Sequence, residues 1–254
     1  MRTLTAVGHR GDPYRVRENT LGSIRSAFAR GADAVEIDVR LTRDGTPVLL
    51  HDETLRRLWG HDVRLDAVTA AQLRELTQGG VPALREALAV AGSGRLMLDL
   101  PGATPEAVRA VVDEVRASGA RERTYYCAGP NSMLAVRAAD PDAGDRPDLD
   151  DAVPRRAGAD RPRGPAWLNY RFGLVSRELT DAVHRDGLGL SAWTADTKRT
   201  MRALLLAGVD SVTTNRVDAL ARYGPSSGGD THRGERARRR EWIRRADPRW
   251  RTSG

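Results

Sequence analysis

Short apolar runs alternate along most of the chain with longer stretches in which apolar residues recur every three or four positions. Runs of the first kind are typical of buried strands, and stretches of the second kind are typical of amphipathic helices. Repeated alternation of the two predicts a parallel sheet, open or closed into a barrel. The predicted strands are residues 4–7, 34–39, 47–50, 95–100, 122–127, 166–170, 189–193 and 211–214. Eight strands favour a barrel, so the expected fold is α/β, a TIM-type (β/α)8 barrel in a single domain.

The predicted helices fill the intervals between these strands. In residues 19–30, apolar side chains recur at helical spacing, and Gly31 is a suitable C-cap. In residues 105–117, Thr104 can cap the helix that Pro105 begins. Further helices are expected at residues 65–76, 81–91, 176–186, 198–207 and 216–223.

Two segments lack this pattern. Residues 140–165 are rich in Asp, Pro, Arg and Gly and have almost no apolar periodicity, which predicts an irregular loop. Residues 224–254 begin with a Gly-Pro-Ser linker and continue into an Arg-rich stretch, which predicts a flexible or disordered tail. We therefore expect a barrel over residues 1–223 and a basic tail over residues 224–254.

The net charge of the chain belongs mostly to this tail. The formal charge is +7, and residues 231–254 hold nine arginines against three acids, so the barrel is close to neutral. A solvated terminus is the favoured interpretation of such a segment. The alternative is a tether to an anionic membrane or to nucleic acid, since Trp242 and Ile243 stand among the arginines.

Three features predict a cytoplasmic protein. The N-terminal residues lack the apolar core of a signal peptide. No apolar run reaches the length of about 18 residues needed to span a membrane, so we expect no transmembrane segment. Cys127 is the single cysteine, which excludes an intrachain disulfide and fits a reducing compartment.

The predicted strand 34–39 carries two carboxylates on one face. Glu36 and Asp38 alternate with apolar residues, so they point away from the helices and into the barrel. Buried carboxylates are costly unless they are paired with cations or bound to a metal. Two oxygen ligands two residues apart suit a hard cation such as Mg²⁺ or Ca²⁺. An ion pair with Arg10 or Arg40 is the alternative, and for the acidic pair on its own it is the favoured one.

Two histidines change this balance, because each follows an apolar run at the end of a predicted strand. Barrels of this type place their active sites at strand ends, where His9 and His51 can reach a shared pocket. Two imidazoles can act as general base and general acid near neutral pH. Arg10 offers a bidentate fork for a phosphate oxygen. Together with the two carboxylates, these residues indicate phosphate chemistry.

The order and spacing of these motifs resemble those of the glycerophosphodiester phosphodiesterase family. The resemblance covers roughly residues 5–100 and 166–222, and it implies a TIM-type barrel that hydrolyses glycerophosphodiesters to sn-glycerol 3-phosphate and an alcohol with a divalent cation. The motifs that carry it are Gly8-His9-Arg10-Gly11, Glu18-Asn19-Thr20, residues 31–39, residues 42–48, His51-Asp52-Glu53-Thr54-Leu55, Ala192-Trp193-Thr194 and residues 208–215.

The resemblance also implies a role for individual residues. By the family pattern, His9 and His51 are the acid–base pair, and Arg10 is a phosphate contact. The metal ligands implied in the same way are Glu36, Asp38 and Asp99. Trp193 matches a tryptophan that lines the family's pocket, although a purely structural tryptophan explains it equally well.

Two positions depart from the family pattern. Pro101 stands where a lysine is expected, which removes a phosphate-binding cation, and Asn215 stands where an aspartate is usual. These departures motivate an alternative function, a barrel that binds phosphodiesters or lipid head groups without cleaving them. A lysophospholipase D-like activity is a further alternative, because related barrels that act on lipid head groups share the histidine pair.

Overall fold

Eight parallel strands form a closed ring in the computed structural model, which describes residues 4–141, 143–149 and 166–223. Every strand pairs with the next one around the ring, and the pairing of β1 with both β9 and β2 closes it. The expected TIM-type barrel is therefore confirmed. In ring order the strands are β1 (Thr5–Gly8), β2 (Ala34–Leu41), β4 (Arg95–Asp99), β5 (Thr124–Ala128), β6 (Gly144–Leu149), β7 (Trp167–Arg171), β8 (Gly189–Trp193) and β9 (Ser211–Thr214).

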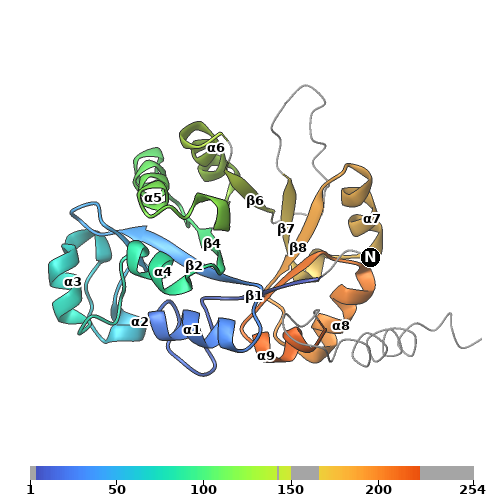
Figure 1. Ribbon diagram of the computed structural model, residues 1–254, viewed down its shortest axis with the longest axis horizontal. Helices are drawn as coiled ribbons and strands as arrows, with labels where there is room; N and C mark the ends of the chain where they lie inside the picture. The colour runs from blue at the N-terminus through green and yellow to red at the C-terminus, as the bar shows by residue number, and fades with distance from the viewer. Residues whose placement is uncertain (1–3, 142, 150–165, 224–254) are drawn as a thin grey trace, which may run out of the picture.

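Helices surround this ring (Figure 1). They are α1 (Leu21–Ala29), α4 (Leu84–Ala91), α5 (Pro105–Ala117), α6 (Pro130–Ala139), α7 (Arg177–Arg185), α8 (Lys198–Ala207) and α9 (Val217–Leu220). Two short helices, α2 (Arg56–Trp59) and α3 (Ala70–Leu76), lie together at one end of the molecule, far from α7 and α8 (Figure 1). Short 3-10 helices are found at η1 (Leu65–Ala67), η2 (Arg121–Arg123), η3 (Phe172–Leu174) and η4 (Ala221–Tyr223).

The alternation predicted for residues 34–39 determines which face of β2 is the core face. Val35, Ile37 and Val39 are buried in the large apolar cluster that includes residues of α1, α4 and α5. The intervening Glu36 and Asp38 are also buried, with 3% and 1% of their surfaces exposed. Apolar side chains thus fill the layer between strands and helices, and the carboxylates are left on the inner face of the ring.

The helix α5 shows how local sequence positions this outer layer. The Thr104 side chain accepts a hydrogen bond from the Ala107 N–H, and Pro105 occupies the first turn, where its missing N–H costs nothing. Four valines at helical spacing are then buried against the sheet: Val108, Val111, Val112 and Val115.

Two of the sequence predictions about strands were wrong. One predicted ring strand lies outside the ring and one ring strand was not predicted, so the predicted number of eight ring strands is still correct. Residues 47–50 do not enter the ring, because β3 (Pro47–Leu49) pairs antiparallel with β2 as a hairpin. Residues 144–149 were expected to be part of an irregular loop, yet they form β6, paired with β5 and β7. Glycine, proline and aspartate disfavour strands, so this strand owes its conformation to its two neighbours rather than to its own residues.

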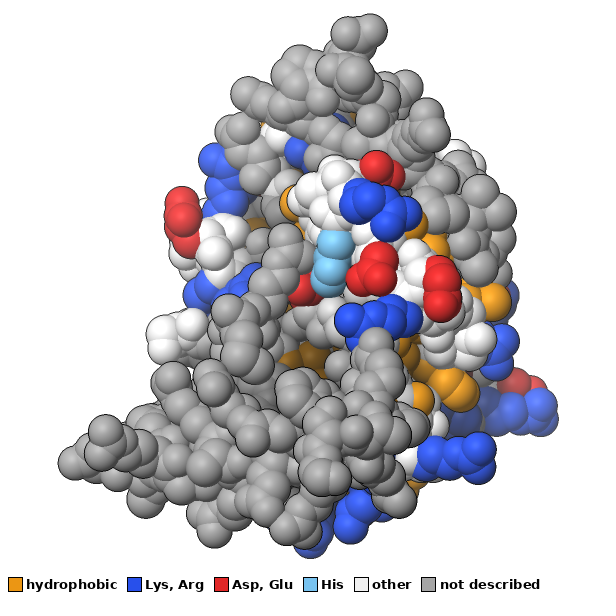
Figure 2. Space-filling view, turned by 90° about the vertical axis from the view of Figure 1, so that its right-hand side faces the viewer, with side chains coloured by type: hydrophobic (Ala, Val, Ile, Leu, Met, Phe, Trp, Pro, Cys, Tyr) orange, Lys and Arg blue, Asp and Glu red, His pale blue; other side chains and the backbone are white. Residues whose placement is uncertain are grey.

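Parts of two other predictions lie outside the described residues, namely the remainder of the expected loop (150–165) and the basic tail (224–254). Among the residues that are described, no helix has the length and hydropathy to cross a bilayer. Figure 2 views the molecule from the side on which α7 and α8 lie, and among the side chains it colours, basic and acidic ones surround a histidine.

Candidate active site

Most of the predicted site residues meet at the carboxyl-terminal end of the ring. His9 and Arg10 directly follow β1, and Asp99 is the last residue of β4. The register places Asp38 opposite Asp99 and Gly8 opposite Val35, so the ends of β1 and β4 flank the part of β2 that carries Glu36 and Asp38. This is the end at which barrels of this type carry their active sites.

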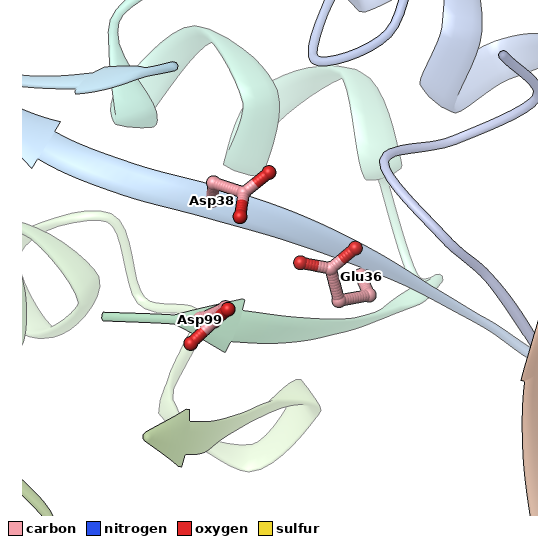
Figure 3. A group of neighbouring side chains, drawn as sticks. All are labelled: Glu36, Asp38 and Asp99. Carbon is pink, nitrogen blue, oxygen red and sulfur yellow. The ribbon is translucent and has the colours of Figure 1, made fainter. Parts of the chain in front are cut away.

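Glu36, Asp38 and Asp99 form a compact acidic cluster (Figure 3). Each contributes a carboxylate oxygen, and these oxygens all lie within 4.8 Å of one another. Burial raises the pKa of Glu36 well above its ordinary value, and the charges of Asp38 and Asp99 raise it further. Oxygen donors at this spacing fit a hard divalent cation, which would remove the cost of holding three carboxylates together.

Arg10 contacts two members of this cluster. Its backbone N–H donates to Glu36 Oε2 at 2.7 Å, and its Nε lies 3.1 Å from Asp38 Oδ2. Asp38 Oδ2 also accepts from Asn19 Nδ2 at 2.7 Å, which fixes the orientation of the carboxylate. The predicted ion pair with Arg10 therefore exists, and Asp38 is its partner.

A tight turn holds Arg10 in this position. Arg10 has a positive φ of 55° and Gly11 one of 92°. A Cβ atom at Gly11 would lie 2.2 Å from the Ser23 Oγ, so only glycine fits against α1. The Ser23 hydroxyl donates to the Arg10 carbonyl and accepts from the Asp12 N–H. The glycines of the Gly-His-Arg-Gly motif are thus required by the backbone of the turn.

His9 is held from the β9 side of the ring. Its backbone N–H donates to the Thr214 carbonyl at 2.9 Å, and its Nδ1 lies 2.8 Å from Asn215 Oδ1. Its Nε2 points toward the acidic cluster, 4.0 Å from Glu36 Oε2. Burial lowers the pKa of His9, and the nearby Arg10 charge lowers it further. Both effects favour the neutral form of His9, whose Nε2 is directed toward Glu36.

His51 reaches the site by a different route from the one expected. It does not follow a ring strand, because β3 runs antiparallel to β2 and carries the chain back from the rim. The Leu50 N–H donates to the Asp38 carbonyl at 3.1 Å, and Arg40 Nε donates to the His51 carbonyl at 2.7 Å. These bonds tie the backbone of residues 50 and 51 to β2 next to Asp38, so the hairpin holds His51 on the same strand that carries two of the three carboxylates.

The imidazole of His51 is oriented by a chain of charged groups. Its Nδ1 lies 2.7 Å from Asp52 Oδ1, and Arg57 Nε donates to Asp52 Oδ2 at 2.6 Å. The hydrogen bond from Arg57, reinforced by His51, lowers the pKa of Asp52 to about 2. Arg57 also donates to Glu18, which accepts from Arg10 Nη1 at 3.0 Å. The chain therefore links His51 to Arg10.

The remaining sequence predictions concern the rim of the barrel. Trp193 ends β8 and is half-buried, which fits both a pocket wall and a structural tryptophan. Pro101 lines a cavity of about 160 Å³ together with Arg40 and Arg64. The cavity is lined by residues of β2 and α5, and none of the three carboxylates of the acidic cluster lines it. Two arginines thus line the same cavity as Pro101, the position at which the resemblance implies a lysine.

Sequence reasoning assigned no role to three contributors to the site: Asp196, which bonds Asn215, and the pair Asp52 and Arg57, which orient His51. Asp52 stands in the His-Asp motif next to a predicted catalytic residue, so its position was a usable signal. Asp196 lies in the loop after β8 and Arg57 lies in α2, and only the folded chain brings them to the partners of the histidines.

A (β/α)8 barrel with two histidines, an arginine and three carboxylates at its carboxyl-terminal mouth has the architecture of a barrel hydrolase. A family model described as the Glycerophosphoryl diester phosphodiesterase family matches residues 9–219, and the chain belongs to this family of hydrolases.

Individual relatives agree with this assignment. The glycerophosphodiester phosphodiesterase of Caldanaerobacter subterraneus subsp. tengcongensis is 25% identical over 248 residues, covering 87% of this chain and 97% of that protein. Human glycerophosphodiester phosphodiesterase 1 is 39% identical over 98 residues, which cover 34% of this chain and 30% of the human protein.

Solved structures share the fold. A glycerophosphodiester phosphodiesterase from Thermotoga maritima superposes with a TM-score of 0.73 at 24% identity, covering 86% of this chain and 97% of that one. An Oleispira antarctica phosphodiesterase in complex with the product sn-glycerol-3-phosphate gives a TM-score of 0.78 at 22% identity, covering 86% and 95%. Both likenesses concern the barrel as a whole.

Proposed function

We propose that the protein hydrolyses glycerophosphodiesters to sn-glycerol 3-phosphate and an alcohol, using Mg²⁺ or Ca²⁺ held by Glu36, Asp38 and Asp99. The observation that carries this proposal is the buried cluster of three carboxylates within 4.8 Å of one another, beside Arg10 and His9. Membership of the family supports it. The product-bound relative from Oleispira antarctica has the same fold and supports the same substrate class.

Each residue has a role that follows from its surroundings. The cation, when bound, supplies positive charge that offsets the charge of the phosphate and of the transition state. Arg10 binds a phosphate oxygen through its guanidinium. The lowered pKa of His9 favours its neutral form, which accepts the proton of the nucleophile through Nε2. His51, held by the Asp52 carboxylate, donates a proton to the leaving alkoxide, and Trp193 lines the substrate pocket.

The second candidate is a barrel that binds phosphodiesters without turnover, and Pro101 is the observation that favours it. Proline offers no positive charge to the phosphate, whereas the family position carries a lysine. Arg40 lines the cavity beside Pro101 and is fixed against the His51 carbonyl. We propose that Arg40 compensates for the missing lysine, which keeps hydrolysis as the favoured function.

The test measures release of sn-glycerol 3-phosphate from glycerophosphocholine and glycerophosphoethanolamine by the full-length chain, with Mg²⁺, with Ca²⁺ and with EDTA. We expect cation-dependent release that EDTA abolishes. Glu36→Gln removes a ligand charge at nearly constant volume and should lower kcat/KM by more than about 100-fold, since a bound cation stabilises the transition state by several kcal/mol. Glu178→Gln, an exposed position on α7, is the matched control. A folded protein that releases no product with either cation would contradict the proposal.

A further inference from the structure

The Nδ1 side of His9 faces a relay of two further side chains. His9 Nδ1 lies 2.8 Å from Asn215 Oδ1, and Asn215 Nδ2 donates to Asp196 Oδ2 at 2.7 Å. Asp196 Oδ1 also accepts from the Asn215 N–H at 2.8 Å and from the Thr214 hydroxyl at 3.1 Å. The residues come from the ends of β1, β8 and β9, and all of these bonds are short enough to be well formed.

The donor and acceptor roles in these hydrogen bonds determine which ring nitrogen of His9 carries the proton. A carboxylate only accepts hydrogen bonds, so the end of the Asn215 amide that faces Asp196 must be its NH₂ group. The amide oxygen is then left facing His9, and it also only accepts. The His9 nitrogen opposite it must therefore donate. In a neutral imidazole, a proton on Nδ1 leaves Nε2 with a free lone pair, and Nε2 is the nitrogen that faces the acidic cluster.

We propose that Asn215 and Asp196 are positioning residues that hold His9 as the tautomer protonated on Nδ1, with the lone pair of Nε2 directed at the substrate. This inference rests on the proposed phosphodiester hydrolysis, in which His9 accepts a proton. Asp196 fixes the amide, and the amide fixes the imidazole. Neither residue contacts the reacting atoms.

The relay acts on the ring of His9 rather than on its backbone. The His9 N–H is already held by the Thr214 carbonyl, and β1 pairs with β9 along four residues of each strand. Ala195, beside Asp196, donates its N–H to the Thr213 carbonyl at 3.0 Å. Main-chain bonds therefore keep the three loop ends together without the side chains of Asn215 and Asp196. We expect variants at these positions to fold.

The structure also explains why an amide at position 215 belongs with a carboxylate at position 196. An aspartate at 215 would place two carboxylates within about 3 Å of each other, and their repulsion would break the relay. Exchanging the two residues restores it. In N215D/D196N, the amide at position 196 donates to the carboxylate at position 215, which still accepts from His9 Nδ1.

The experiment compares wild type, Asn215→Leu, Asn215→Asp and N215D/D196N as full-length proteins, with glycerophosphocholine as substrate. Asn215→Leu preserves the size of the side chain without its hydrogen bonds, and it should lower kcat by about 10- to 100-fold with KM changed less than about twofold, as is usual for residues that orient a reacting group. Asn215→Asp should be similarly impaired, and the double exchange should recover most of the loss. Asn131→Leu, an exposed position on α6, is the control and should behave as wild type.

A spectroscopic measurement tests the same inference without turnover. The ¹⁵N shifts of the histidine rings report which nitrogen carries the proton, and His9→Ala assigns the signals. We expect wild-type His9 to be protonated on Nδ1 and Asn215→Leu to show a mixture of tautomers. A wild-type ring protonated on Nε2, or an Asn215→Leu variant with unchanged kcat and tautomer, would overturn the relay. Absence of hydrolysis in wild type would instead overturn the proposed function and leave the ring measurement intact.

Discussion

The two histidines of the site are the same residue type in two different settings. His9 follows a ring strand, is bonded through its backbone to β9, and has 20% of its side chain exposed. His51 lies on a hairpin outside the ring and has 41% of its side chain exposed. Nδ1 of His9 faces a neutral amide, whereas Nδ1 of His51 faces the carboxylate of Asp52. A neutral partner suits a ring that accepts a proton, and a carboxylate suits a ring that carries positive charge before it donates one.

The largest effect that tests this comparison is the loss of either histidine. His9→Ala and His51→Ala should each reduce kcat on glycerophosphocholine by about 10²- to 10⁴-fold, the usual contribution of general acid–base groups. The two variants should separate on a substrate in which 4-nitrophenol replaces choline. A nitrophenolate leaves without being protonated, so His51→Ala should regain most of its activity while His9→Ala should not.

Steady-state kinetics on both substrates provide the measurement, and wild type on each substrate is the reference. If the nitrophenyl ester rescues His9→Ala instead, the roles assigned to the two rings are reversed. If it rescues neither variant, the two histidines do not have the separate roles of proton acceptor and proton donor that are proposed.

The two histidines also belong to parts of the chain that pack around different apolar clusters. His9 belongs to the barrel, but the segment after His51 packs around a separate apolar cluster of its own. Two contacts dock this segment on the loop after β1: Arg57 bonds Glu18 at 2.6 Å, and Arg17 lies over the Trp59 ring at 4.3 Å. The residues of the separate cluster are Val48, Leu50, Leu55, Leu65, Val68, Leu73 and Val81. A small cluster held by a few polar contacts is expected to open before the barrel does.

Leu55→Ala tests this division of the core. Leu55 is fully buried in the small cluster, so its truncation should cost about 2–5 kcal/mol. The substitution should lower the stability of the segment that packs around the small cluster, and this segment is expected to open separately. Amides of residues 53–81 should therefore lose hydrogen-exchange protection, while those of β4 and β5 keep theirs. The matched variant is Leu98→Ala, since Leu98 is equally buried in the barrel core and its loss should lower protection in both regions. Equal loss in both regions for Leu55→Ala would mean that the chain unfolds as a single unit.

The same division separates what the sequence could predict from what it could not. Glu36 and Asp38 could be placed inside the ring, because alternation along one strand needs only neighbouring residues. The strand β3 was mistaken for a ring strand, because a short apolar run does not reveal its pairing partner, and β6 was missed because its own residues disfavour a strand.

The side chains that orient the two rings depend on contacts that local patterns do not encode. Asn215 meets His9 across 206 residues of sequence, and Arg57 meets Glu18 across 39. A motif can place a histidine at the site, but the identity of its hydrogen-bond partner, and hence its role as acid or base, is fixed only by the closed ring and the docked hairpin.

The smallest effect concerns the ion pair that supports His51. Arg57 lowers the pKa of Asp52 from its ordinary value of 3.8 to about 2. A carboxylate with a lowered pKa in the folded state binds fewer protons there than in the unfolded state, so stability rises with pH across this window. The contribution is complete above about pH 4 and is lost as the pH falls toward 2. Arg57→Leu should remove it, so the melting temperature of the variant should fall less steeply than that of wild type between pH 5 and pH 2.5.

At pH 7 the same substitution should cost less than about 1 kcal/mol, because the pair is partly exposed and screened by solvent. Thermal unfolding across the pH range measures both effects, and Arg56→Leu, at an exposed position on the same helix, is the control. Parallel melting profiles for wild type and Arg57→Leu would mean that Arg57 does not hold Asp52 ionised. In that case the orientation of His51 would not depend on Arg57, and Arg57→Leu would leave kcat unchanged as well.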